Sequence, residues 1–148
     1  MKVRTEISAG GVVYQKTADN TLWLITQHSK HKGWSFPKGL VGDTDKGEKK
    51  ETAAVREVEE EGGVKARITD KASVSAQYKY RFGDFLVRKT VHYFLMEYLS
   101  GDPKNHDWEV SDAKFVSEAE VKNTLSFRSD KDAFSKILKL YKTLCTQY

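Results

Sequence analysis

The sequence REVEEEGG, residues 56–63, places four carboxylates and one guanidinium at the end of a segment rich in helix-forming residues. The whole segment, EKKETAAVREVEEEGG, spans residues 48–63, contains no proline and ends at paired glycines, the usual stop signal of a helix. The sequence therefore predicts a helix whose last turns concentrate negative charge.

The acids of this helix are predicted to share its small apolar face. At 3.6 residues per turn, Glu57, Glu60 and Glu61 fall on the same side as two alanines one turn earlier. Like charges at these spacings repel, and burial raises the cost unless something positive is present. A hard divalent cation would satisfy the acids, and Arg56 could hold one carboxylate in place. Glu48, on the opposite side, is expected to face solvent, and a solvated acidic helix is the ordinary alternative for the whole segment.

The spacing of the acids and glycines decides between these interpretations. The pattern runs Gly42, five residues, Glu48, seven residues, Arg56, Glu57, Val58, one residue, Glu60, Glu61, one residue, Gly63, Val64. It matches every position of the Nudix box, so the chain resembles the Nudix hydrolases. The resemblance covers most of the sequence, from the first strand SAGGVVY through the box to the later strands and the closing helices.

The remaining segments favour a layered domain. Strand-like runs span residues 7–15 and 21–28, which are expected to form a hairpin, and residues 66–82 and 85–99, which are joined by a Gly-Asp turn. Residues 34–47 are expected to form a loop, because glycine, aspartate and proline break regular structure there.

Amphipathic helices are predicted over residues 117–125 and 129–144. Strands and helices mixed in this order indicate a sheet covered by helices. The resemblance makes this α/β fold a Nudix-type α/β/α sandwich with a central mixed β-sheet, formed as a single domain by residues 1–148.

The resemblance also implies a reaction. Nudix hydrolases cleave a nucleoside diphosphate linked to another group, with water as nucleophile and usually Mg²⁺ as the metal, for which Mn²⁺ can substitute. Glu57, Glu60 and Glu61 are then the expected metal-binding group, and Glu48 is an outer ligand or a water-holder. Glu109, ahead of a predicted strand, is expected to add a metal ligand or a general base. Arg56, Glu57 and Glu109 are the expected catalytic residues, and either Glu57 or Glu109 can be the base.

The loop before the helix departs from the common family pattern. In many members the box glycine directly follows an FPxG turn, but here FPKG ends at Gly39 and three extra residues separate it from the box spacing. Either Gly39 or Gly42 can therefore be the structural equivalent of the box glycine. The helix and its acids are unaffected.

Three signals resemble the Nudix enzymes that act on diadenosine polyphosphates. Lys38 lies in a PKG turn, Tyr80 follows Val64 by sixteen residues, and KTVHYF runs from Lys89 to Phe94. The expected substrate-binding residues are Lys38, Tyr80, Lys89 and Tyr93, with core packing as the alternative for Tyr93. The expected reaction is cleavage of diadenosine tetraphosphate to ATP and AMP.

Other functions fit the same box. They are hydrolysis of a nucleoside triphosphate in nucleotide sanitation, removal of pyrophosphate from an RNA 5′ end, and cleavage of a diphosphoinositol phosphate. A non-catalytic nucleotide-binding or RNA-binding module is a further alternative, although such a module has no use for a repulsive acid cluster. The expected partner is a small nucleotide, with an RNA end less favoured and no membrane.

The composition of the chain bears on its structural class and cellular location. The chain of 148 residues is 39% hydrophobic and 31% charged with a formal charge of +4, which is typical of a globular domain. Its single cysteine, Cys145, can form no internal disulfide and no cysteine-based metal site. No segment approaches the roughly 20 apolar residues that a membrane span needs. These features predict a cytoplasmic protein, as a monomer or weak dimer.

Overall fold

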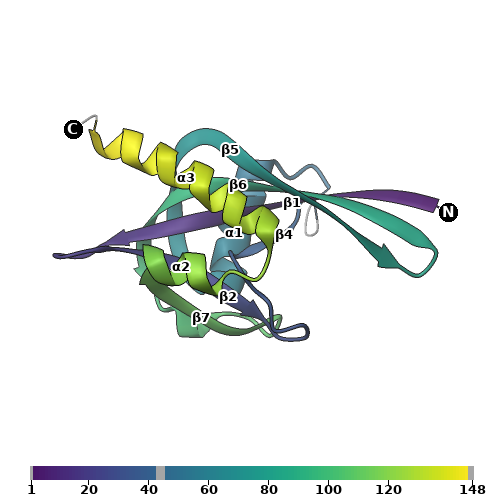
Figure 1. The fold of residues 1–148 in the computed structure, drawn as a ribbon, viewed down its shortest axis with the longest axis horizontal. Coiled ribbons are helices and arrows are strands. Elements are labelled where there is room, and N and C mark those ends of the chain that lie inside the picture. Colours follow the sequence, from purple (N-terminus) through teal and green to yellow (C-terminus); the bar gives the residue numbers. More distant parts are fainter. Residues whose placement is uncertain (1, 43–45, 147–148) are drawn as a thin grey trace.

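A computed structural model describes residues 2–42 and 46–146 (Figure 1). The elements follow in the order β1 (Lys2–Lys16), β2 (Thr21–His28), β3 (Trp34–Ser35), β4 (Lys38–Leu40), α1 (Lys50–Gly62), β5 (Val64–Phe82), β6 (Phe85–Gly101), the 3₁₀ turn η1 (Pro103–Asn105), β7 (Val110–Ser117), α2 (Glu118–Thr124) and α3 (Arg128–Thr146). No helix in the described part of the chain is long and apolar enough to cross a membrane.

One mixed sheet forms the centre of the fold. Its strands run in the order β3-β2-β1-β6-β5, while β4 pairs with β1 and β7 pairs with β2. The pairing of β1 with β6 is parallel and continues over thirteen residue pairs, whereas the other pairings are antiparallel. The predicted mixed sheet and its two hairpins are confirmed.

Two apolar clusters lie on opposite faces of the sheet, because successive residues of a strand point to opposite sides. Ala9 and Val13 of β1 pack with α1 through Ala53, Ala54 and Val58. The alternate residues of β1, including Val12 and Tyr14, pack with the apolar face of α3. Helices therefore cover both faces, as the Nudix-type sandwich requires.

The predicted loop over residues 34–47 is partly wrong. Trp34 and Ser35 pair with β2, and Lys38 to Leu40 pair with β1. Phe36 between them is fully buried, so this turn is anchored in the core. The two short strands carry Lys38 to the edge of α1. Residues 43–45 of the predicted loop lie outside the described residues.

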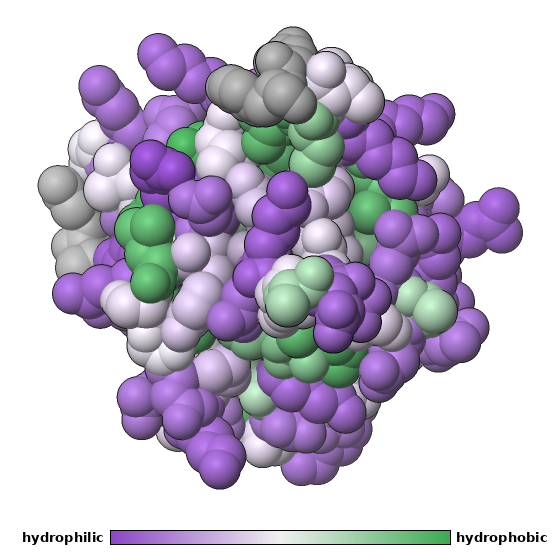
Figure 2. Space-filling model, turned by 90° about the vertical axis from the view of Figure 1, so that its left-hand side faces the viewer, coloured by the Kyte–Doolittle hydropathy of each residue, from purple (hydrophilic) through white to green (hydrophobic). Residues whose placement is uncertain are grey.

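A three-stranded extension projects from the body beside the amino terminus (Figure 1). It is formed by residues 2–7 of β1, 77–82 of β5 and 85–90 of β6, and we refer to it as the arm. The opposite end of the molecule exposes mostly hydrophilic side chains, and its apolar patches are small and separated (Figure 2).

Candidate active site

Helix α1 brings its acids to the sheet through small residues. It ends at Gly62 and is capped by Gly63, which has a left-handed backbone (φ 74°) and donates its N–H to the carbonyl of Glu59. Gly11 of β1 faces Val58 so closely that a Cβ at Gly11 would lie 2.6 Å from a methyl carbon of Val58. This close approach places the buried face of α1, including Glu57, directly against the sheet.

Arg56 gathers three carboxylates around one guanidinium. Its Nε donates to Glu48 Oε2 at 2.7 Å and its Nη2 to Glu48 Oε1 at 2.9 Å. Its Nη1 donates to Glu57 Oε1 at 2.8 Å and to Glu60 Oε2 at 3.1 Å. The two parallel bonds to Glu48 are the bidentate geometry that only arginine provides. The expectation that Arg56 holds a carboxylate is therefore confirmed.

The prediction that Glu48 faces solvent is wrong. Its side chain is 5% exposed, and besides Arg56 it accepts a hydrogen bond from the backbone N–H of Gly42 at 3.2 Å. The hydrogen bond from Arg56 lowers the pKa of Glu48. Because Glu48 precedes the helix, the chain can fold it back onto Arg56, where it fixes the guanidinium that orients Glu57.

Both glycines before the helix contact this network. A Cβ at Gly39 would lie 2.1 Å from the carboxyl carbon of Glu57, so only glycine leaves room for that acid. Gly42 has a positive φ of 81°, which favours glycine, and its N–H donates to Glu48. Gly39 therefore faces Glu57 on the buried side, while the backbone N–H of Gly42 binds Glu48.

The carboxylate of Glu57 is buried and has a raised pKa. Burial raises the pKa to about 7, and the nearby charges of Glu60 and Glu109 add to the rise. The hydrogen bond and charge of Arg56 oppose the shift. Near neutral pH this group therefore binds and releases a proton readily.

Glu61, one turn further along α1, behaves similarly. Its Oε1 accepts the backbone N–H of Lys38 at 3.2 Å. Burial raises its pKa to about 8, the charge and N–H of Lys38 lower it, and Glu57 and Glu109 raise it. Buried carboxylates whose pKa values are raised further by other carboxylates are in an environment that favours a cation.

These carboxylates fit a hard divalent cation by their chemistry. Glu57 and Glu61 offer oxygen ligands on one side of α1, and Glu60 adds a half-exposed carboxylate beside them. No set of three or more His, Cys, Asp or Glu side chains within the described residues is already arranged around a metal position. Binding would therefore displace protons from Glu57 and Glu61 and draw their carboxylates together.

The loop that carries Glu109 is attached to the end of α1. Asp107 donates its backbone N–H to the carbonyl of Glu60 at 2.8 Å, and the N–H of Glu109 donates to Asp107 Oδ1 at 3.1 Å. Glu109 is exposed, and its charge raises the pKa of both Glu57 and Glu61. It therefore lies within electrostatic reach of the two acids.

Asp107 is a member of this acidic group that sequence reasoning missed. Burial and the charges of Glu109 and Glu60 raise its pKa. Its position two residues before Glu109, in the same DWE segment, was the signal that could have indicated it.

A cavity of about 730 Å³ begins at Lys38. Three predicted substrate-binding residues, Lys38, Tyr80 and Lys89, line it together with Tyr78, His31 and Phe127. The Lys89 ammonium lies 6.0 Å from the centre of the Tyr78 ring. Burial and the charge of Lys38 lower the pKa of Lys89, while Glu6, Glu61 and Glu57 raise it. Lysines and aromatic rings therefore line a space that adjoins the acids.

Tyr93 is not available to a substrate, which corrects the prediction for this residue. Its side chain is fully buried, and its hydroxyl donates to Asp130 Oδ1 at 2.8 Å. Ser35 donates to the other carboxylate oxygen of Asp130 at 2.7 Å, and Lys38 Nζ donates to the Ser35 hydroxyl at 3.3 Å. Tyr93 thus supports the floor beneath Lys38, and core packing, the alternative interpretation, holds.

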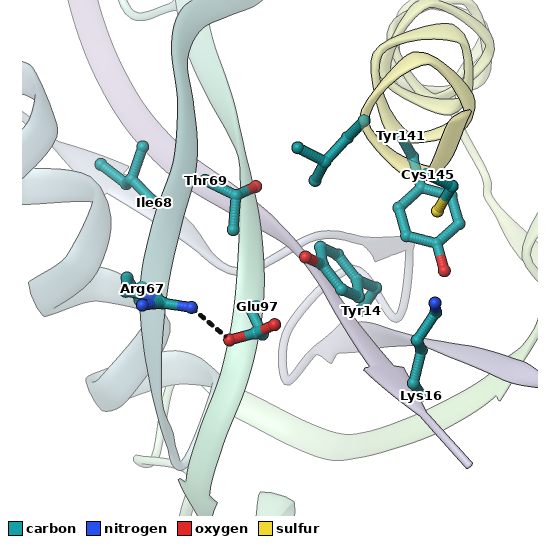
Figure 3. A pocket seen from close by; sticks show the side chains of 9 residues that line it. Tyr14, Lys16, Arg67, Ile68, Thr69, Glu97, Tyr141 and Cys145 are labelled. Carbon is teal, nitrogen blue, oxygen red and sulfur yellow. Dashed lines mark hydrogen bonds and ion pairs between the residues drawn. The ribbon is translucent and has the colours of Figure 1, made fainter. Parts of the chain in front are cut away.

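A second cavity, of about 560 Å³, lies elsewhere (Figure 3). Tyr14, Tyr141 and Cys145 line it, and an ion pair of 2.6 Å joins Arg67 to Glu97 at its side. None of the α1 acids lines this cavity. The acids of α1 and the cavity at Lys38 are therefore the candidate active site.

Comparisons with known proteins identify the family of the chain. Residues 4–137 match the NUDIX domain. The chain is 30% identical over 137 residues to the putative mutator protein MutT4 of Mycobacterium tuberculosis, covering 88% of this chain but 54% of that protein. It thus spans about half the length of that relative.

Solved structures share the fold. An Ap4A hydrolase of Caenorhabditis elegans in a binary complex superposes with a TM-score of 0.76 at 23% identity, covering 97% of this chain and 99% of that chain. The NUDIX domain of Shewanella oneidensis NrtR complexed with ADP ribose gives a TM-score of 0.65 at 20% identity, covering 95% and 88%. With the NUDIX match spanning most of its length, and the box acids gathered around Arg56, the chain belongs to the Nudix hydrolase family.

Proposed function

We propose that this chain is a Mg²⁺-dependent hydrolase of dinucleoside polyphosphates that cleaves diadenosine tetraphosphate to ATP and AMP. The observation that carries the proposal is the double role of Lys38. Its backbone N–H binds Glu61 at 3.2 Å, and its side chain lines the cavity of lysines and tyrosines. Phosphates held near the acids would therefore lead into a space with cations for further phosphates and flat rings for a base.

The acids supply the metal ligands in this proposal. Glu57, Glu60 and Glu61 would hold Mg²⁺ or Mn²⁺, and Glu109 would add a ligand from its loop. When bound, the cation would neutralise phosphate charge and lower the pKa of the attacking water. Arg56 holds Glu57 and Glu60 in orientation, and Glu48 holds Arg56.

Other side chains bind the substrate and accept the proton of the attacking water. Lys38 and Lys89 bind the phosphates, and Tyr80, with Tyr78 beside it at a ring distance of 6.2 Å, stacks on adenine. Two carboxylates can accept the proton of the water. Glu57 has a pKa of about 7, which suits a base at neutral pH, whereas Glu109 is exposed and can approach from its loop.

Product analysis in ¹⁸O-water tests the proposal. Diadenosine tetraphosphate and Mg²⁺ should yield ATP and AMP, with the label in AMP, if water attacks the phosphorus that bears the departing AMP. ADP as the sole product would contradict the asymmetric cut, and label in ATP would contradict the point of attack.

A second candidate function is hydrolysis of a nucleoside triphosphate. It is favoured by the likeness to MutT4, which is described as a putative mutator protein. Cleavage of nucleoside triphosphates without cleavage of diadenosine tetraphosphate would select this function.

A further inference from the structure

The arm has an exposed face on the side of the sheet that α1 covers. Residues that are direct partners on neighbouring strands project to the same side of a sheet. The odd-numbered residues of β1 lie on the α1 side, because Ala9 and Val13 pack with that helix. The register continues this side along the arm in three rows, which we call the shelf: Ile7 with Thr90 and Gln77, Thr5 with Arg88 and Lys79, and Val3 with Leu86 and Arg81.

The shelf combines exposed apolar side chains with unpaired cations. Val3 is 54% exposed and Ile7 is 47% exposed, so neither supports the core. Arg81 and Arg88 are exposed, and neither forms an ion pair within the residues that the structure describes. Exposed apolar patches mark interaction sites, and arginine is enriched at protein interfaces. The composition of the shelf therefore favours a protein partner that brings negative charge.

The outward side of α1 has that charge. Glu51 and Glu59 are exposed, and the half-buried Val55 lies between them at helical spacing. In the described part of the chain neither acid forms an ion pair. Helix α1 begins close to the shelf, since burial and the charge of Lys50 lower the pKa of His92, which lies two residues beyond the shelf on β6. One chain thus carries both an unpaired basic surface and an unpaired acidic one.

The shelf and α1 together form a step. The arm extends past the body of the domain (Figure 1), and the exposure of Val3 and Ile7 shows that its shelf is uncovered. A helix is about 10 Å across, so the outward side of α1 stands about one helix layer above the shelf. A second copy related by a two-fold axis can place its own α1 in this step, while its shelf receives the first α1. Each contact then joins arginines to glutamates.

We propose that the shelf and the outward side of α1 form a two-fold interface between two copies of this chain. The second copy is the partner because each chain supplies both complementary surfaces, as an isologous interface requires. From strand spacing and rise, the shelf measures about 14 Å by about 20 Å. Two such contacts would bury roughly 1,100 Å² in total, at the low end of specific interfaces. The dimer therefore dissociates on dilution. This inference does not depend on the proposed function.

Sedimentation equilibrium over a concentration series tests the interface. From about 1 µM to about 1 mM, the molar mass of the wild type should rise from the 16.9 kDa of one chain toward twice that value. The double variant Arg81→Glu/Arg88→Glu places acids against acids and should stay at the mass of one chain. The double variant Glu51→Lys/Glu59→Lys places cations against cations and should stay there too.

An equimolar mixture of the two reversed variants gives the sharpest result. In the mixed dimer each contact again joins cations to acids, one in the wild-type sense and the other in the reversed sense. The mixture should therefore regain the concentration-dependent mass that each variant lacks alone. A change in folding of either variant would not produce this recovery.

A matched pair of reversals controls for net charge. Lys136→Glu/Lys139→Glu makes the same change of charge on the exposed side of α3, which packs on the other face of the sheet. This variant should associate as the wild type does. A wild type that stays at the mass of one chain, association that survives both reversals, an equal loss in the α3 variant, or a mixture that stays monomeric would each overturn the proposal.

Discussion

Helices α1 and α3 each bury a carboxylate, and the two carboxylates differ in their hydrogen-bond partners and in the charges around them. Asp130 of α3 is 3% exposed and accepts one hydroxyl hydrogen bond on each oxygen, from Tyr93 and from Ser35. Glu57 of α1 is 4% exposed, is held by Arg56, and has other carboxylates around it that raise its pKa.

The difference is the one expected between an acid that stabilises the fold and an acid that binds a cation. Two neutral donors satisfy Asp130 within the fold. Burial and nearby carboxylates raise the pKa of both Glu57 and Glu61, so their environment favours protons or a cation. The α3 acid should therefore contribute to stability, and the α1 acids should cost stability and provide chemistry.

The largest expected effect is the loss of kcat when an acid of α1 is replaced. Glu57→Gln or Glu61→Gln should each lower kcat by roughly 10²- to 10⁴-fold, because each removes an oxygen donor or proton acceptor at the reaction centre. Steady-state kinetics with diadenosine tetraphosphate and circular dichroism on the same samples would measure this. Near wild-type turnover in either variant would show that α1 is not the reactive helix.

Glu109 should affect rate more than affinity. As a base or loop ligand it acts in the transition state, so Glu109→Gln should lower kcat while KM changes little. Glu118→Gln provides an exposed control, since Glu118 pairs with Lys122 one turn away on α2. If Glu109→Gln has wild-type kinetics, Glu57 is the remaining candidate for the base.

A smaller effect, on stability, is expected at Asp130. Tyr93→Phe removes one hydroxyl donor and leaves a buried carboxylate oxygen unpaired, which should cost about 1–3 kcal/mol of unfolding free energy. Urea unfolding of the metal-free protein would measure the loss. An unchanged midpoint would mean that Asp130 needs only Ser35.

The pH dependence of stability should follow the α1 acids. Their pKa values in the folded protein, about 7 and about 8, lie above the ordinary value of 4.5, so the folded state binds protons more tightly than the unfolded state. The stability of the metal-free protein should therefore fall as pH rises from about 4.5 to about 8 and then level off. In Glu57→Gln the fall should be smaller. A wild-type slope in that variant would assign the titration to other groups.

Much of the fold and part of the site could be predicted from sequence. Helix α1 was predictable because a run of helix-forming residues is followed by Gly63. The hairpin at residues 83–84 was predictable because a Gly-Asp turn separates two strand-like runs. The gathering of acids at Arg56 followed from helical spacing. These features depend on residues that are close in the chain.

The predictions that were wrong depend on distant contacts. The side chain of Glu48 is covered because the chain folds back onto Arg56, and Tyr93 is buried because α3 brings Asp130 over its strand. Nothing in the alternation of KTVHYF distinguishes a tyrosine under a helix from one that faces a cavity. The short strands at residues 34–35 and 38–40 likewise exist only because β1 and β2 offer edges to them.

Unfolding with and without metal tests the central claim, that the α1 acids are completed by a divalent cation. A ligand that binds only the folded state stabilises it in proportion to the logarithm of its concentration over Kd. At pH 8, Mg²⁺ should raise the urea midpoint of the wild type, while Glu61→Gln should be at least as stable as the wild type in EDTA and gain little from Mg²⁺. An equal Mg²⁺-induced gain in the wild type and in Glu61→Gln would contradict the claim.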